Sequence, residues 1–167
     1  IGIEAFQHVQ EKIAEIWVNL ETMKAFLRAA EADAELDPFG AMRPAWDPLD
    51  AARNLYPRLY PRMIEIIQQL GASGLVSNPT EGDINGPLTE EIKRYYQAAR
   101  AEAHERIPIF RLAWDTAVSA FGSRQVLYER FFFGDPVRMA GALVNNHDRT
   151  QYMDRVRDFL AKAKDGS

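Results

Sequence analysis

The chain has 167 residues, and 47% of them are hydrophobic, a composition typical of a globular protein with a core. Its formal net charge is −4, which disfavours a nucleic-acid partner because such binders need a basic stripe to displace counterions from phosphates. The absence of cysteine excludes disulfides, thiolate metal sites and cysteine nucleophiles within the chain. No apolar stretch is long enough to span a bilayer, and charges among the first twenty residues argue against a signal peptide.

The first predicted element is a long helix that ends near Ala34. Its apolar residues alternate between spacings of three and four, which places them on one helix face and is typical of helix bundles. These residues are Phe6, Val9, Ile13, Ile16, Leu20, Met23 and Leu27. Because the chain begins at Ile1, without an initiating methionine and close to this helical pattern, we interpret it as a fragment of a longer protein.

A connector over residues 37–48, rich in proline and glycine, separates this helix from the next. Asp47 is expected to be the N-cap of the second helix, with Pro48 as its first residue. Pro57 and Pro61 interrupt the apolar spacing that follows. Because an internal proline removes a helix hydrogen bond, they predict a kinked or two-piece helix.

Gly71 is the predicted C-cap of the second helix and the start of a long loop that reaches Leu88. A glycine-rich loop of this length often carries function, although a plain surface excursion fits the composition equally well. Thr89 begins the next predicted helix, because Glu90 and Glu91 then lie at its positive end.

Apolar spacing continues from there to Gly122, with a kink or a new helix start expected at Pro108. Three consecutive phenylalanines, Phe131 to Phe133, interrupt the pattern that follows. They cannot all face one core, so some are expected to contact another domain, subunit or ligand.

Cap signals predict two further helices. Asp135 and Pro136 are typical of a helix start, and Asp148 with Gln151 resembles a capping box for the last helix. No segment shows the alternation of apolar and polar residues that is typical of a β-strand. The residues therefore predict an all-α helix bundle.

The sequence contains no recognisable catalytic or metal-binding constellation. His8, His104 and His147 lack metal-ligand spacing, and there is no Glu-x-x-His pair of the kind that di-iron bundles use. Glycine loops for nucleotides are also absent. We assign no catalytic residue and no metal ligand, and the one anomalous segment covers residues 119–138.

This segment reads SAFGSRQVLYERFFFGDPVR, and it closely resembles the C-terminal signature of the 4-hydroxyphenylacetate 3-hydroxylase family. Its most specific part runs from Phe121 to Asp135. Three other stretches also resemble the family, so that the resemblance covers nearly the whole chain. They are FQHVQ at residues 6–10, ASGLV at 72–76 and RLAWD at 111–115.

Enzymes of this family are similar in architecture to acyl-CoA dehydrogenases, with an N-terminal helical domain, a middle β-domain and a C-terminal four-helix bundle. The resemblance implies that residues 1–167 form that bundle as a single domain, without the two preceding domains. It also implies that bundles pack into a homotetramer and that flavin is held partly by bundle residues.

The activity that the resemblance implies is two-component hydroxylation in the cytoplasm. A separate flavin reductase supplies FAD in its reduced form, FADH2. The oxygenase uses it with O2 to hydroxylate a phenolic substrate at the carbon ortho to the hydroxyl group. Acid–base residues for the substrate are expected in the preceding domains, so the isolated fragment is expected to be inactive.

By the same resemblance, the cofactor-binding residues lie in one turn and the residues after it. They are Phe121, Gly122, Ser123, Arg124, Gln125 and, with weaker support, Tyr128. A glycine permits close approach of a ligand, amides at a helix start bind pyrophosphate, and Arg124 and Gln125 are suited to phosphate and to ribose or adenine. The alternative is that Gly122 only ends a helix and Arg124 is a surface cation, and the resemblance favours flavin contact.

Two other functions stay open. One is a relative of 4-hydroxybutyryl-CoA dehydratase, which uses flavin with an iron–sulfur cluster. It is less favoured because a bundle cysteine is expected among the cluster ligands. The other is a helical oligomerisation module without a ligand. A DNA-binding helical domain is disfavoured by the negative charge.

Overall fold

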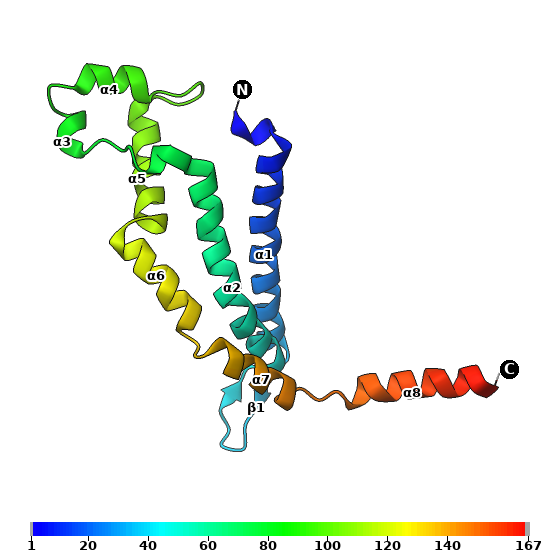
Figure 1. Cartoon of the computed structure of the whole chain (residues 1–167). Helices are drawn as coiled ribbons and strands as arrows, with labels where there is room; N and C mark the ends of the chain where they lie inside the picture. The colour runs from blue at the N-terminus through cyan, green and yellow to red at the C-terminus, as the bar shows by residue number, and fades with distance from the viewer. Residues whose placement is uncertain (1, 166–167) are drawn as a thin grey trace.

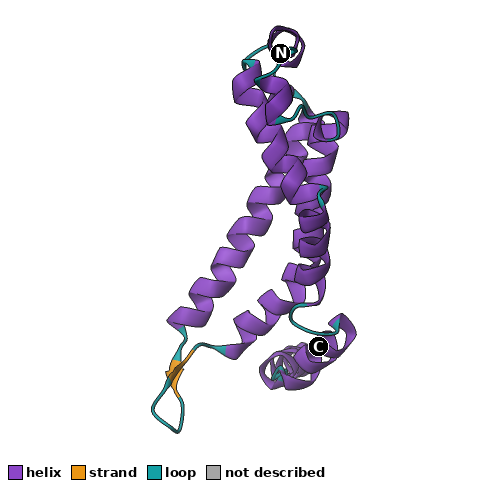
Figure 2. Ribbon diagram, turned by 90° about the vertical axis from the view of Figure 1, so that its left-hand side faces the viewer, coloured by secondary structure: helices purple, strands orange, loops and turns teal. Residues whose placement is uncertain are grey.

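The computed structural model describes residues 2–165, with side chains through residue 163, and this part of the chain is almost wholly helical (Figure 2). The helices are α1 (Gln7–Ala32), α2 (Trp46–Gly71), α3 (Glu81–Ile84), α4 (Thr89–Tyr96), α5 (Ala103–Ala117), α6 (Ala120–Phe131), α7 (Pro136–Asn146) and α8 (Thr150–Asp165). Two 3-10 turns, η1 (Ile3–Ala5) and η2 (Ala72–Leu75), complete them. The predicted all-α fold is confirmed.

Helix α2 lies at the centre of an elongated bundle (Figure 1). Helix α1 packs along one side of it, while α5 and α6 follow one another along another side. Helix α7 packs against α2 near the end where α2 begins, and α8 extends away from that end. Helices α1, α2, α5 and α6 therefore form the body of the bundle.

The buried core follows the central helix. Ile66 of α2 and Ile107 of α5 are the largest fully buried side chains. The apolar face predicted for α1 is covered only in part: Val9 is buried, whereas Ile13 and Leu20 are exposed. Helix α4 covers the N-terminal half of α5, where Ile92 of α4 packs against Ile107. A core this thin leaves much apolar surface uncovered on the outer helices.

A short hairpin joins α1 to α2, contrary to the expectation that the chain holds no strands. Strands β1 (Glu35–Leu36) and β2 (Met42–Arg43) pair antiparallel. The Asp37 carboxylate closes the turn by accepting hydrogen bonds from the Phe39 and Ala41 amides, each at 2.9 Å. Gly40 adopts φ +81° there, which glycine does without strain. Strands of two residues are too short to show a sequence alternation.

The predicted boundaries of α2 are corrected at both ends. Ala45 and not Asp47 is the N-cap, and Asp47 lies in the first turn. Gly71 is the last helical residue, and Ala72, with φ 46°, is the C-cap. The helix is one continuous element through Pro57 and Pro61, so the prediction of a two-piece helix is wrong. The two prolines are four residues apart and interrupt hydrogen bonding on one face only.

The long loop predicted from Gly71 to Leu88 folds in large part into the turns η2 and α3. Helix α3 begins with a capping box in which Thr80 Oγ1 accepts the Asp83 amide at 3.2 Å and the Asp83 carboxylate accepts the Thr80 amide at 2.8 Å. Hydrogen bonds from Thr80 lower the pKa of Asp83. The predicted start at Thr89 is confirmed.

The starts of three further helices, α5, α7 and α8, were also predicted from the sequence. Helix α5 begins at Ala103 and contains Pro108, so Pro108 is not its start. The predicted start of α7 is confirmed, because Asp135 accepts the Val137 amide at 3.0 Å and Pro136 is the first helical residue. The capping box predicted for α8 does not form, because the helix begins at Thr150 and Gln151 is only its second residue.

The junction between α5 and α6 is held by one serine. Ser119 is the N-cap of α6, and its hydroxyl accepts the Gly122 amide at 3.0 Å while donating to the Asp115 carbonyl at 2.6 Å. Ser119 is itself buried. The same side chain therefore starts one helix and holds the end of the other.

Gly122 lies inside α6, which contradicts the alternative that it only ends a helix. It is buried, and a Cβ atom at this position would lie 2.5 Å from the Thr116 carbonyl oxygen and 2.6 Å from that of Asp115. These are backbone atoms, which cannot move away as the end of a flexible side chain can. The missing side chain therefore permits the close approach of α6 to the end of α5.

We expect Gly122→Ala to lower the free energy of unfolding by about 1–3 kcal/mol, the usual cost of overpacking. Gly141→Ala is the matched control, because Gly141 also lies inside a helix but a Cβ there meets nothing within 4 Å. This control should stabilise the protein by roughly 0.5–1 kcal/mol through helix propensity. Denaturant unfolding measures both, and equal effects of the two substitutions would contradict the packing role of Gly122.

Helices α1 and α2 are joined by a two-pronged ion pair. Arg62 donates from Nε to one Glu15 carboxylate oxygen at 2.7 Å and from Nη2 to the other at 2.9 Å. The hydrogen bond from Arg62 lowers the pKa of Glu15 below its usual value of 4.5. Because the folded pKa is lowered, the pair adds stability above the ordinary pKa and loses it as pH falls through the lowered value.

We therefore expect Glu15→Gln to lower the thermal midpoint at pH 7, with the difference from the unchanged protein shrinking below about pH 4. Glu90→Gln is the control, because its pair with Lys93 at 2.8 Å lies within one helix and is exposed. That control should change the midpoint by no more than about 1 °C. A difference for Glu15→Gln that is constant from pH 7 to pH 3 would show that the pair is not its cause.

Candidate functional site

The candidate site is the first two turns of α6 and the surface next to them. The structure places Phe121, Gly122, Ser123, Arg124 and Gln125 in these turns, with Tyr128 one turn further along. Phe121, Arg124, Gln125 and Tyr128 recur at helical spacing, so four of the six predicted residues share one face of α6. Ser123 is exposed beside this face, and Gly122 is buried.

The donors at the start of α6 suit an anionic ligand. The amides of Ala120 and Phe121 have no acceptor within residues 2–165, as is usual for the first residues of a helix. Arg124 donates from Nε to the Ala120 carbonyl at 3.2 Å, which leaves its terminal guanidinium nitrogens available. A helix N-terminus with an adjacent guanidinium group attracts phosphate oxygens.

Aromatic surface accompanies these donors. Phe121 is 56% exposed and Tyr128 is 52% exposed, and the Tyr128 ring lies 4.9 Å from that of Phe132. Exposed rings of this size offer flat apolar surface to a planar ring system. The donor set and the rings therefore fit a flavin nucleotide, and contact with flavin itself stays a prediction.

Gln125 is positioned by a polar cluster in which Tyr56 and Tyr60 of α2 meet Glu129 of α6. Its amide nitrogen donates to Glu129 at 2.6 Å. Burial, and after it the charge of Glu129, raises the pKa of Tyr56 to about 12. Burial and then Glu129 raise the pKa of Tyr60 as well. The cluster fixes the orientation of Gln125 and joins the candidate site to the central helix.

Sequence reasoning did not identify this cluster. Tyr56 and Tyr60 are four residues apart, which places them on one face of α2, but that spacing is equally typical of core residues. Their carboxylate partner, Glu129, is distant in the sequence. Only the packing of α6 on α2 brings the three side chains together.

The three consecutive phenylalanines separate as predicted. Phe133 turns inward, where its ring meets Tyr56 edge-on at 6.3 Å and lies 5.9 Å from the Arg53 guanidinium carbon. Phe131 and Phe132 are exposed. They extend the apolar face of α6 beyond the candidate site.

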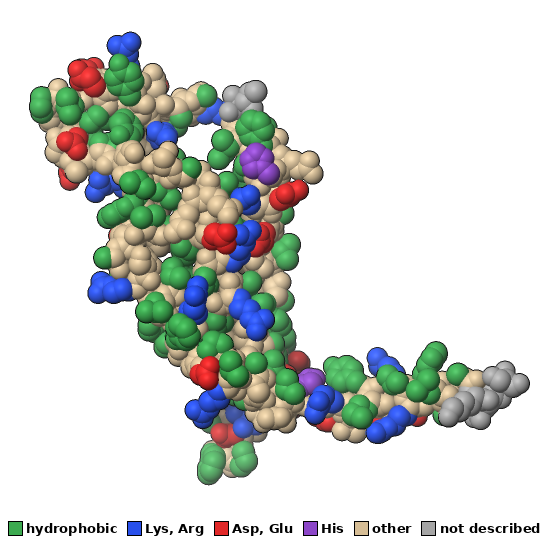
Figure 3. Space-filling model, in the orientation of Figure 1, with side chains coloured by type: hydrophobic (Ala, Val, Ile, Leu, Met, Phe, Trp, Pro, Cys, Tyr) green, Lys and Arg blue, Asp and Glu red, His purple; other side chains and the backbone are tan. Residues whose placement is uncertain are grey.

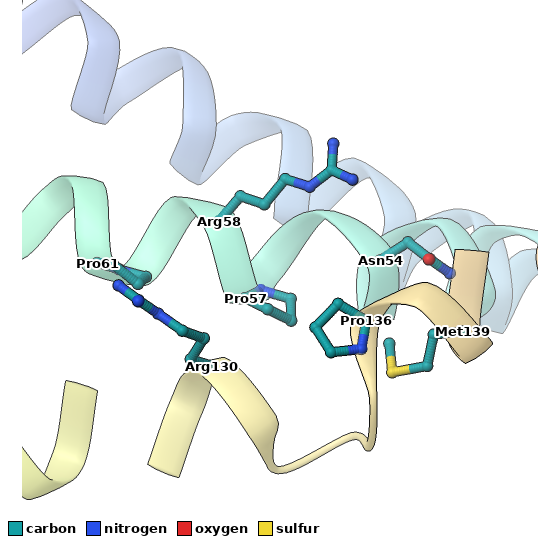
Figure 4. Close-up of a pocket in the computed structure, with 7 residues that line it drawn as sticks. All are labelled: Asn54, Pro57, Arg58, Pro61, Arg130, Pro136 and Met139. Carbon is teal, nitrogen blue, oxygen red and sulfur yellow. The ribbon is translucent and has the colours of Figure 1, made fainter. Parts of the chain in front are cut away.

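A pocket that the sequence did not indicate lies between α2, α6 and α7 (Figure 4). It has a volume of about 260 Å³. Pro57, Pro61 and Pro136 form much of its wall. The Arg130 side chain extends along Pro61, whereas the Arg58 guanidinium points away from Arg130. The two arginine heads therefore do not converge on one point.

Within residues 2–165, no group of three or more histidine, aspartate or glutamate residues is arranged to hold a metal ion. In the same part of the chain, no helix combines the length and apolar character that crossing a membrane requires.

Comparison with known proteins identifies the family. The model of the family "4-hydroxyphenylacetate 3-hydroxylase C terminal" matches residues 1–161. The oxygenase component of 4-hydroxyphenylacetate 3-monooxygenase from Thermus thermophilus is 53% identical over 163 residues, which cover 98% of this chain and 34% of that protein. The chain thus spans about a third of the length of this relative.

Solved structures agree with this assignment. The oxygenase component HpaB of 4-hydroxyphenylacetate 3-monooxygenase, complexed with FAD, matches with a TM-score of 0.93 and 52% identity over 99% of this chain and 35% of its own. An archaeal 4-hydroxybutyryl-CoA dehydratase from N. maritimus matches with a TM-score of 0.81 over 96% of this chain and 32% of its own, but at 17% identity this likeness concerns the fold alone. The chain belongs to the 4-hydroxyphenylacetate 3-hydroxylase C-terminal family.

Proposed function

We propose that the chain is the C-terminal helical domain of a flavin-dependent monooxygenase that hydroxylates a phenol ortho to its hydroxyl group with O2. On this proposal residues 1–167 form a single domain, which an N-terminal helical domain and a middle β-domain precede in the full-length protein. The observation that carries it is the start of α6, where free amides, Arg124 and two exposed rings fit a flavin nucleotide.

The proposed cofactor is FAD, delivered as FADH2 by a separate flavin reductase. Two findings on relatives support this choice. The Thermus thermophilus protein is named an oxygenase component, and HpaB has been solved with FAD and with FAD together with 4-hydroxyphenylacetate. We accordingly propose a phenolic substrate of the hydroxyphenylacetate class, a cytoplasmic location and a homotetrameric assembly.

The roles of this chain are to bind and to orient the cofactor. The amides of Ala120 and Phe121, together with Arg124, are suited to the pyrophosphate, and Gln125 to the ribose or adenine. Phe121 and Tyr128 are suited to flat contact. When bound, FAD supplies the activation of oxygen and the transfer of one oxygen atom to the phenol. No residue of this chain is proposed as catalytic.

Two rival functions make different predictions. A dehydratase of the 4-hydroxybutyryl-CoA class shares the fold, but that likeness comes at 17% identity. An oligomerisation module without a ligand would agree with the exposed apolar residues on α1, α6 and α8. It would not need the amides and the guanidinium group at the start of α6 for binding.

We expect Arg124→Ala combined with Gln125→Ala to weaken FADH2 binding by the full-length protein roughly ten- to a hundredfold, the usual value of charge-assisted hydrogen bonds. The single variant Arg124→Lys keeps the positive charge and leaves Gln125 unchanged. It should bind FADH2 more tightly than the double variant does. Anaerobic titration monitored by flavin fluorescence gives the affinity, and light scattering confirms that the mass of the assembly is unchanged.

Lys24→Ala is the control for the loss of one surface cation, because Lys24 lies on α1 and pairs with Glu21 within that helix. It should leave flavin affinity unchanged. If the double variant binds FADH2 as tightly as this control does, the start of α6 does not contact the flavin and the oligomerisation module becomes the better account.

A further inference from the structure

Glu129 is a half-buried carboxylate that has no cation beside it. It lies on α6, one turn after Gln125. Among the residues whose side chains the structure describes, it forms no ion pair. Withdrawing a charge from water costs free energy unless hydrogen bonds or an opposite charge replace the lost water. The partners of this carboxylate therefore indicate why the helix carries it.

Two uncharged donors take the place of a cation. The Tyr56 hydroxyl group is hydrogen-bonded to Glu129, and the Gln125 amide nitrogen donates to it at 2.6 Å. Tyr56 is itself held by packing, because its ring meets that of Tyr60 at 6.0 Å and that of Phe133 edge-on at 6.3 Å. The carboxylate thus connects a packed ring of the central helix to an amide of the candidate site.

This arrangement fixes the direction of each hydrogen bond. An ionised carboxylate only accepts hydrogen bonds, so Tyr56 donates its O–H to Glu129 and Gln125 turns its NH2 group toward the same side chain. The amide of Gln125 carries its oxygen, Oε1, on the other branch, which faces away from the carboxylate. A glutamine side chain can otherwise present either its oxygen or its nitrogen to a ligand. Here Glu129 leaves only the oxygen for that purpose.

The oxygen belongs to the face of α6 that holds the candidate site. Phe121, Arg124 and Tyr128 share this face with Gln125, and hydrophobic side chains gather along α6 in the space-filling view (Figure 3). Within the described part of the chain, Oε1 of Gln125 accepts no hydrogen bond. An acceptor held in one orientation on such a face favours a ligand group that donates, and it disfavours the oxygens of a phosphate.

We propose that Glu129 is a positioning residue for cofactor binding, which with Tyr56 behind it fixes the Gln125 amide so that Oε1 accepts a hydrogen bond from a hydroxyl or amino group of the nucleotide. The adenosine half of FAD carries both kinds of donor, in its ribose hydroxyl groups and in the amino group of adenine. The ionised pyrophosphate carries neither, and it is left to Arg124 and the helix amides. This inference rests on the proposed function and assigns to Gln125 one ligand chemistry.

A double-mutant cycle in the full-length protein tests the role of Glu129. Glu129→Gln keeps the shape of the side chain, but an amide can donate as well as accept and so no longer fixes the direction of Gln125. We expect this change to weaken FADH2 binding roughly three- to tenfold, and to have almost no further effect in the Gln125→Ala background, because residues that act through one another are not additive. Anaerobic titration monitored by flavin fluorescence gives the four affinities.

Tyr56→Phe removes the donor behind Glu129 and should show the same dependence on Gln125, with a smaller loss. Glu90→Gln is the matched control, because it makes the same chemical change as Glu129→Gln on the exposed surface of α4. It should leave FADH2 affinity unchanged. A purely structural role of Glu129 would weaken binding by the same factor whether or not Gln125 is present.

Two analogues of the cofactor identify the donor. One carries hypoxanthine in place of adenine, which puts a carbonyl oxygen where the amino group was. The other carries a 2′,3′-dideoxyribose in its adenosine half. In reduced form, the analogue that lacks the contacted donor should bind the unchanged protein roughly tenfold more weakly than FADH2 does. The same analogue and FADH2 should bind Gln125→Ala about equally, because the acceptor is then absent.

The possible contradictions are distinguishable. If Gln125→Ala leaves FADH2 affinity unchanged, the proposed flavin contact fails together with the positioning role. If Gln125→Ala weakens binding but Glu129→Gln does not, or weakens it equally in both backgrounds, only the positioning role fails. If both analogues bind the unchanged protein as tightly as FADH2 does, Oε1 of Gln125 accepts no donor of the adenosine half and the assigned ligand chemistry is wrong.

Discussion

Helix α2 holds the bundle together, because α1, α5, α6 and α7 all pack on it. Helix α1 is held to it by the pair between Glu15 and Arg62, and α6 by the cluster of Tyr56, Tyr60 and Glu129. Helices α5 and α7 complete the contacts of the central helix. Because α6 is positioned from this side, its neighbouring face presents Arg124 and the exposed rings to the surface. Gln125 joins the two faces, because it belongs to the candidate site and donates to Glu129 of the cluster.

The bundle leaves apolar surface where a fully covered domain would bury it. The outer face of α1, the rings of α6 and the side chains of α8 through residue 163 are exposed, while the core around α2 is thin. This distribution agrees with a domain that completes its packing against other domains and other copies. Flavin binding and assembly would then be linked, because both use surfaces that the isolated chain exposes.

Features set by neighbouring residues could be predicted from the sequence. The cap formed by Asp135 and Pro136, the helix start at Thr89 and the division of the three phenylalanines follow local rules, and all are present. Features that depend on distant parts of the chain could not be predicted. Gly122 is needed by the carbonyls at the end of α5, not by a helix end, and the partner of Tyr56 lies far along the sequence. The site residues themselves were identified by family resemblance, and helical spacing alone would have left them as surface.

The most direct test of the proposed function is the origin of the oxygen atom in the product. The full-length protein is supplied with FADH2, 4-hydroxyphenylacetate and 18O-labelled O2, and the aromatic products are analysed by mass spectrometry. The account predicts a catechol that carries one labelled oxygen next to the original hydroxyl group. Flavin that is reoxidised with no labelled product from this acid or from other simple phenols would contradict it.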